Sequence, residues 1–153
     1  PLIYQAGSAS RTALLARFRE SGNATLIGTE SFWEGVDIPG DALEMLVMLK
    51  LPFAVPTEPI IEAITEKIKA GGKNPFLEYS VPEAVIKFKQ GFGRLIRNRN
   101  DTGIALFLDN RLSFKQYGRL FMESLPGRYS YVKSSDDLFK KMHFWFSRKR
   151  MKR

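Results

Sequence analysis

The sequence predicts an α/β protein built on a mainly parallel sheet with helices on both faces, and two observations predict it. Short apolar segments typical of strands alternate along the 153 residues with amphipathic segments of helical length, which is the order of elements in parallel α/β domains. The segments at residues 43–51 and 103–108 are mostly apolar, as expected of strands that are buried on both faces.

The elements of the first half follow from local patterns. The apolar run at residues 2–5 predicts a short strand, and Ser10 can cap a helix over residues 11–19, where apolar side chains recur at helical spacing. The runs at residues 25–27 and 43–51 predict the next two strands. Functional loops of parallel sheets follow the carboxyl ends of strands, so the loop after residue 27 is a candidate site.

The second half continues the alternation. Prolines end the third strand before a helix over residues 58–70, which two glycines terminate. Further elements are expected as a helix at residues 82–97, a strand at 103–108, a helix at 114–124, a strand at 129–132 and a helix from residue 136. We therefore expect one domain at residues 1–135, followed by a C-terminal helix and basic tail at residues 136–153.

Composition restricts the classes of function. The net charge is +8, but residues 139–153 hold seven basic side chains and no acid, so the rest of the chain is nearly neutral. The chain has no cysteine and one histidine, His143, so thiolate sites and sites built from several histidines are excluded and no metal site is expected. No apolar window approaches the ~20 residues that cross a bilayer, and no membrane partner is expected. A start at Pro1 is expected of a piece of a longer protein.

The helix expected at residues 82–97 has two distinct faces. Its apolar residues form one face, while Gln90, Gly93, Arg94 and Arg97 share the other at helical spacing. Glycine inside a helix costs ~1 kcal/mol relative to alanine, and such a glycine often permits close approach of a ligand. The polar face is either an ordinary solvated surface or a pair of arginines directed at a phosphate, which the guanidinium binds with two parallel hydrogen bonds.

Two segments resemble helicase motifs. Residues 90–97, with the sequence QGFGRLIR, resemble motif VI of superfamily-2 helicases, Q-x-x-G-R-x-x-R. Residues 28–40, with the sequence GTESFWEGVDIPG, resemble motif V of the DinG and XPD branch, and residues 50–56 and 74–76 also resemble DinG sequences. The chain is therefore identified as resembling the C-terminal motor domain of a DinG-like, ATP-dependent DNA helicase, over about residues 5–110.

The resemblance implies a RecA-like helicase C-terminal domain. By the same resemblance Arg94 and Arg97 are catalytic arginine fingers that reach ATP on another domain, Gln90 positions this face, and Gly93 allows close approach to the nucleotide. Gly35 and Asp37 would face the nucleotide, and Thr29 and Ser31 would hold a DNA phosphate. Asp37 as a loop cap and Trp33 as a packing residue remain the alternatives to a role at the ligand.

The resemblance also implies the partners. ATP and Mg²⁺ would be bound mainly by a first RecA-like motor domain of the same protein, because the chain has no G-x-x-x-x-G-K-[ST] phosphate loop. Single-stranded DNA and a cytoplasmic location are expected, and an iron–sulfur cluster would belong to the first domain. The alternatives are a nucleic-acid-binding or nuclease-associated module without helicase activity, and a scaffold for other proteins. The basic tail either binds nucleic acid or docks on a neighbouring domain.

Overall fold

The computed structural model of the chain describes residues 2–4, 9–29 and 43–151. The strands are β1 (Leu2–Tyr4), β2 (Thr25–Ile27), β3 (Met45–Met48) and β4 (Ile104–Phe107). The helices are α1 (Arg11–Ser21), α3 (Pro59–Ala70), the π-helix η2 (Phe76–Ser80), α4 (Val81–Phe92), α5 (Arg111–Phe114), α6 (Gly118–Glu123) and α7 (Ser135–Met151). Strands and helices alternate through most of the chain, as the sequence predicts.

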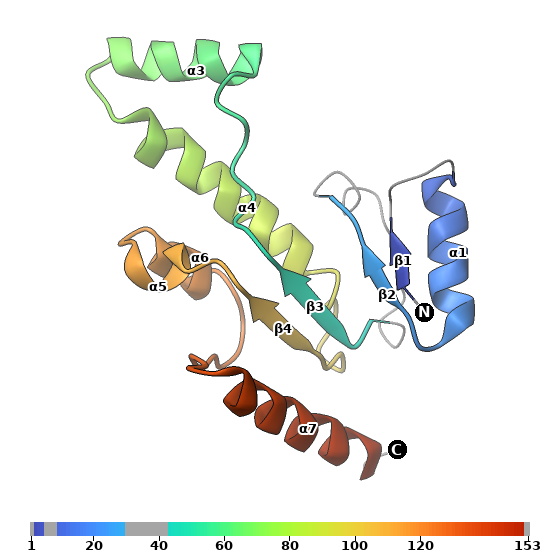
Figure 1. Cartoon of the computed structure of the whole chain (residues 1–153). Coiled ribbons are helices and arrows are strands. Elements are labelled where there is room, and N and C mark those ends of the chain that lie inside the picture. The colour runs from blue at the N-terminus through green and yellow to red at the C-terminus, as the bar shows by residue number, and fades with distance from the viewer. Residues whose placement is uncertain (1, 5–8, 30–42, 152–153) are drawn as a thin grey trace.

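The N-terminal elements form a small β-α-β unit. β1 and β2 pair in parallel, with Ile3 opposite Leu26, and α1 lies against them (Figure 1). Ser10 caps α1 as predicted, because its hydroxyl accepts a hydrogen bond from the backbone N–H of Ala13 at 3.3 Å. The helix ends at Gly22, whose φ of 59° lies in the left-handed region that glycine adopts without strain.

The central elements form a second parallel pair. β3 pairs with β4 from Met45 opposite Ile104 to Met48 opposite Phe107, and the two strands lie side by side at the centre of the molecule (Figure 1). The described strands thus form two separate two-stranded parallel sheets. The α/β class and the parallel pairing are as predicted, whereas the described residues show no single larger sheet.

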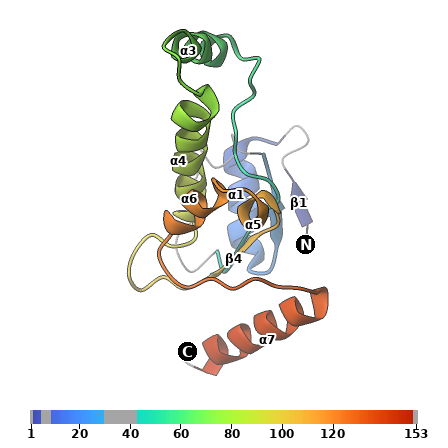
Figure 2. The ribbon, with the colours of Figure 1, turned by 90° about the vertical axis from the view of Figure 1, so that its left-hand side faces the viewer.

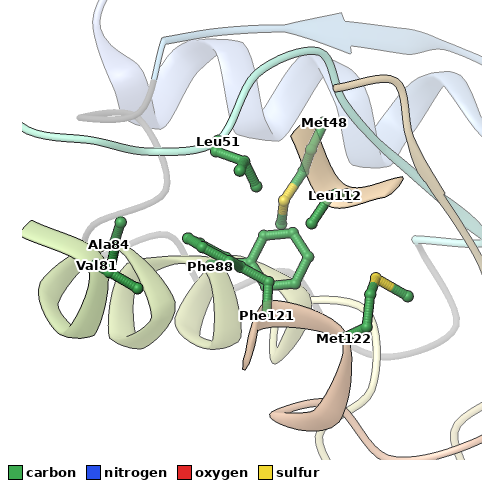
Figure 3. Packing of buried hydrophobic residues seen from close by; sticks show 8 residues of the cluster. All are labelled: Met48, Leu51, Val81, Ala84, Phe88, Leu112, Phe121 and Met122. Atoms are coloured by element: carbon green, nitrogen blue, oxygen red, sulfur yellow. The ribbon is translucent and has the colours of Figure 1, made fainter. Parts of the chain in front are cut away.

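The main hydrophobic core lies between the β3–β4 pair, α4 and the α5–α6 corner (Figure 3). Phe88 of α4 and Phe121 of α6 are both 0% exposed. Their rings meet edge to face, with centroids 5.3 Å apart, in the geometry that aromatic pairs prefer. This core fixes the end of α4 relative to β4.

The helix α3 projects from this core (Figure 2). It begins with Pro59 in its first turn and ends at Gly71, as predicted, yet none of its residues is fully buried. The π-helix η2 that leads into α4 was not predicted. Asn74 stabilises its start, because the Asn74 side-chain oxygen accepts a hydrogen bond from the Phe76 backbone N–H at 3.0 Å.

Two predictions about the last third of the chain are wrong. The helix expected at residues 114–124 is split into α5 and α6, and the Gly118 backbone packs so closely on α5 that an added Cβ would lie 2.5 Å from the Leu112 carbonyl oxygen. Residues 129–132 are not a strand, because no described strand pairs with them. Their Tyr129 and Tyr131 side chains are exposed instead.

The helix α7 confirms the predicted terminal helix and extends into the basic segment. Ser134 caps it, since its hydroxyl accepts a hydrogen bond from the Asp137 backbone N–H at 3.2 Å. The Lys149 ammonium pairs with the Glu44 carboxylate, just before β3, at 2.9 Å. Arg148 and Lys149 are therefore part of a helix that contacts the body. None of the helices in the described residues is long and apolar enough to cross a membrane.

Candidate functional site

The candidate site lies where α4 ends. The buried face of α4 carries Val81, Ala84, Phe88 and Gly91, so the helix is held firmly against the core. Gln90 lies in its last turn and is exposed on the opposite face. Gly93 caps the helix, and its backbone N–H donates to the Lys89 carbonyl oxygen at 2.9 Å. The prediction that Gln90 and Gly93 share an accessible face is compatible with this placement.

The predicted length of this helix is wrong. α4 stops at Phe92. Arg94 lies in the turn that follows and Arg97 in the irregular segment after it, so the two arginines do not share a helical face. Two glycines in the last four residues before Arg94 weaken the helix. The chain then turns tightly, with the Leu95 backbone N–H donating to the Phe92 carbonyl oxygen at 2.9 Å.

Leu95 anchors this turn. Its side chain is 1% exposed, and an added Cβ at Gly103 would lie 2.4 Å from Leu95 Cδ1. Leu95 therefore occupies the space that a side chain at residue 103 would need. The position of Arg94 is set by this contact, because Arg94 directly precedes the anchored residue.

Arg94 has an unusual environment. The residue is half-buried, and its Nε atom is buried without a hydrogen-bond partner. A buried donor without a partner costs roughly 1–3 kcal/mol, and more when the group is charged, so such groups call for a functional or structural reason.

Arg97 lies in a different setting, exposed directly before the turn that begins at Asn98. The Asp101 carboxylate accepts hydrogen bonds from the backbone N–H groups of Arg97 at 2.8 Å and Asn98 at 3.0 Å. These two hydrogen bonds lower the pKa of Asp101 below its usual value, and the bond from Arg97 has the larger effect. They do so because they stabilise the charged carboxylate. The backbone at Arg97 is thus fixed by Asp101, while its side chain lies at the surface.

Of the four other residues expected to bind DNA or the nucleotide, only Thr29 is among the described residues. Thr29 is exposed two residues after β2, at the carboxyl end of that strand, where the sequence predicts a functional loop. Ser31, Gly35 and Asp37 lie outside the described residues, as does Trp33. The structure therefore groups Gln90, Gly93, Arg94 and Arg97 around the end of α4, while Thr29 follows β2.

Sequence reasoning missed an ion pair at the carboxyl ends of β3 and β4. The Asp109 carboxylate accepts bonds from Arg111 Nη2 at 2.6 Å and Nε at 2.9 Å, and from the Leu51 backbone N–H at 2.8 Å. The hydrogen bond from Arg111 is the main reason that the pKa of Asp109 falls to about 2. The Arg111 guanidinium also lies over the Phe53 ring, 5.2 Å from its centroid. An Asp-x-Arg pattern directly after a buried strand was the available signal.

Comparison with known proteins decides the family. Residues 1–128 match the family described as the helicase C-terminal domain. The chain belongs to the helicase C-terminal domain family. The match confirms the resemblance inferred from motifs V and VI, since it spans both segments.

Curated relatives of this helicase C-terminal domain carry related names. It is 46% identical over 126 residues to the ATP-dependent DNA helicase YoaA of Escherichia coli, covering 82% of this chain and 20% of that protein. It is 47% identical over 113 residues to the 3'-5' exonuclease DinG of Bacillus subtilis, covering 74% and 12%. It is 44% identical over 124 residues to the ATP-dependent DNA helicase DinG of Photobacterium profundum, covering 78% and 18%. The helicase C-terminal domain thus spans a fifth or less of the length of these relatives.

Proposed function

We propose that this chain is the second, RecA-like motor domain of an ATP-dependent DNA helicase and that Arg94 acts on ATP bound by a first motor domain of the same protein. The observation that carries the proposal is the buried, unpartnered Nε of Arg94. A fixed guanidinium with an unused donor is suited to stabilise the charge that develops on a transferred phosphoryl group. The names of the relatives support the same activity.

The neighbouring residues have supporting roles in this proposal. Gln90 presents its amide on the exposed face of α4, one turn before Arg94, where it can orient a nucleotide-bound water. Gly93 leaves the surface next to Arg94 free of a side chain. Arg97 acts as the second finger from its exposed position, after the first motor domain closes on this one.

The proposal places ATP and Mg²⁺ mainly on the first motor domain. Within residues 2–4, 9–29 and 43–151, no group of three or more histidine, cysteine, aspartate or glutamate side chains is placed to hold a metal ion. The described residues offer arginines for a phosphate but show no such cluster of metal-binding side chains. Thr29 and Ser31 would hold a phosphate of single-stranded DNA, and Gly35 and Asp37 would face the nucleotide.

The test uses the full-length protein that contains this domain. Arg94→Ala should lower kcat for ATP hydrolysis by roughly 10³-fold or more, as loss of an arginine finger does elsewhere, with little change in ATP affinity. Arg94→Lys should restore only part of kcat, because an ammonium lacks the planar fork. Lys89→Ala, which removes an exposed cation from α4, is the matched control. Normal turnover in Arg94→Ala would reject the proposal.

A second candidate is a nuclease-associated module that binds nucleic acid without ATP-driven unwinding. One relative, with 47% identity, is named a 3'-5' exonuclease. That name supports an association with a nuclease. Strand-displacement assays on the full-length protein with and without ATP separate the two. ATP-dependent unwinding supports the helicase, whereas single-strand binding that ignores ATP supports the module.

A further inference from the structure

A polar groove lies beside the α5–α6 corner, away from the candidate ATP-facing turn. Its volume is about 470 Å³, and its polar lining comprises Ser113, Lys115, Gln116, Arg119, Tyr129 and Tyr131. A groove of this size is comparable to known small-ligand pockets, at ~300–1,000 Å³. Because α5 follows β4 and Arg94 precedes it, the groove and Arg94 lie at opposite ends of that strand.

Two tyrosines form one wall of the groove. Tyr129 and Tyr131 are 57% and 61% exposed, and their rings stand edge to face with centroids 6.0 Å apart. The segment that carries them belongs to no helix or strand. Lys141 of α7 lies against it, with Nζ 3.5 Å from the Tyr131 carbonyl oxygen and 3.1 Å from the Asp137 carboxylate. Because more than half of each tyrosine is exposed, both residues are accessible to a ligand.

The groove is also positively charged. Lys115 and Arg119 line it, and no acidic residue does. Arg119 is tied to Glu123 by a 2.5 Å contact, so its charge is partly neutralised, whereas Lys115 has no ion-pair partner among the described residues. A phosphate placed beside Lys115 would therefore meet a cation that is not already paired.

We propose that this groove binds single-stranded nucleic acid, with bases stacked on Tyr129 and Tyr131 and a backbone phosphate on Lys115. Exposed aromatic rings beside cations are the combination that single-strand binding proteins use, since every base has a face that can stack. The Ser113 hydroxyl and the Gln116 amide add hydrogen-bonding groups that suit phosphate or base edges. The ligand is the one already proposed for Thr29 and Ser31, so the inference rests on that part of the proposed function, but it adds a separate site where binding needs neither ATP nor a first motor domain.

The main experiment measures binding of the 153-residue chain to a fluorescent oligothymidylate by anisotropy. An oligomer of about 12 nucleotides lies within the size range of single-strand modules. Tyr129→Ala and Tyr131→Ala should each weaken binding about 5-fold to 100-fold, as loss of a stacked base does, and Tyr→Phe at each position should retain it. Phe114→Ala is the matched control, because Phe114 lies on α5 and is 82% exposed but does not line the groove.

A second measurement separates bases from charge. An abasic oligomer of the same length keeps the phosphates, so it should bind more weakly to the unmodified chain and be insensitive to the tyrosine variants. Lys115→Ala should flatten the plot of log affinity against log salt by about 0.7, whereas the exposed Lys67→Ala on α3 should leave the slope unchanged.

Three outcomes would overturn the proposal. They are unchanged binding in both tyrosine-to-alanine variants, equal affinity for the abasic oligomer, or equal competition by polyglutamate, which would assign the groove to an acidic protein. None of these measurements involves ATP. A failure here is therefore distinct from a failure of the Arg94 test, which reads ATP turnover.

Discussion

Arg94 illustrates a conflict between stability and function at the scale of one residue. Its Nε is buried without a partner, and a buried unsatisfied donor costs roughly 1–3 kcal/mol. Arg94→Met keeps the length and apolar stem of the side chain but removes that donor. We expect Arg94→Met to raise the free energy of unfolding of this chain by about 1 kcal/mol, as measured by urea denaturation.

The matched control is Lys89→Met, at an exposed residue in the last turn of α4. Removing an exposed charge changes stability by less than about 0.5 kcal/mol in most cases. If Arg94→Met destabilised the chain by more than Lys89→Met did, the buried guanidinium would be a structural group, and the interpretation of Arg94 as a group poised for a ligand would fail.

The ion pair of Asp109 leads to a second prediction, on how the free energy of unfolding depends on pH. Its side chain is 7% exposed and pairs with Arg111, which lowers its pKa from 3.8 to about 2. Because the pKa is lower in the folded state, the ionised carboxylate stabilises that state fully at pH values above 3.8, the pKa expected in the unfolded chain. This stabilisation is lost as the pH falls through about 2. Asp109→Asn should therefore lower the free energy of unfolding at pH 7 by about 2 kcal/mol.

The expected pH dependence provides the check. The difference between Asp109→Asn and the unmodified chain should be constant from pH 7 to about pH 4 and shrink towards pH 2, because Asp109 itself becomes protonated there. Glu66→Gln, at an exposed carboxylate on α3, should show no such difference. A pH-independent difference for Asp109→Asn would mean that shape, rather than charge, is responsible.

At the scale of elements, the end of α4 shows what the sequence can and cannot predict. The apolar spacing correctly places Phe88 in the core, whereas the roles that motif VI implies for Gln90, Gly93 and Arg94 stay predictions. The same spacing continues through Leu95 and wrongly extends the helix. Leu95 is buried by a turn that packs it against Gly103, a contact between distant residues that periodicity does not contain.

The Leu95–Gly103 contact leads to a prediction of its own. Gly103→Ala would place a Cβ 2.4 Å from Leu95 Cδ1, so Leu95 or the strand must move. Overpacking of this kind costs typically 1–3 kcal/mol. We expect that loss in thermal or urea denaturation of the chain, together with reduced ATP turnover when the change is made in the full-length protein, because the turn holds Arg94.

Gly71→Ala is the matched control for this substitution. Its added Cβ would lie 3.4 Å from the nearest atom, the Ile68 carbonyl oxygen, and the residue has a φ of −79° that alanine adopts freely. Stability close to that of the unmodified chain is expected. Equal losses at both glycines would show that the loss at Gly103 does not come from Leu95.

Other elements were mispredicted for reasons of the same kind. Tyr129 and Tyr131 alternate with other residues as in a strand, but a strand needs a neighbour with free backbone groups, and none of the described strands pairs with this segment. The Asp109–Arg111 pair was missed because the sequence does not reveal that the Leu51 backbone N–H, from the end of β3, also reaches Asp109. Local patterns thus predicted most elements but not the contacts between them.

At the scale of the whole molecule, the proposed division of labour predicts an inactive chain. The 153 residues contain no phosphate loop, and the described residues contain no cluster that could hold a metal ion. We therefore expect no ATP hydrolysis by the purified chain, with or without single-stranded DNA, in a phosphate-release assay. DNA-stimulated turnover that persists through purification and disappears in Arg94→Ala would contradict this.

The long connection between β3 and β4 has a consequence for synthesis. Each β3 residue pairs with a residue 59 positions later, as Met45 does with Ile104. At ~5–20 residues per second, a ribosome needs on the order of 3–12 seconds to deliver the partner strand. During that interval the apolar segment around Met48 has no strand to pair with. This stretch of the nascent chain is therefore where we expect a chaperone to bind while the protein is still being made.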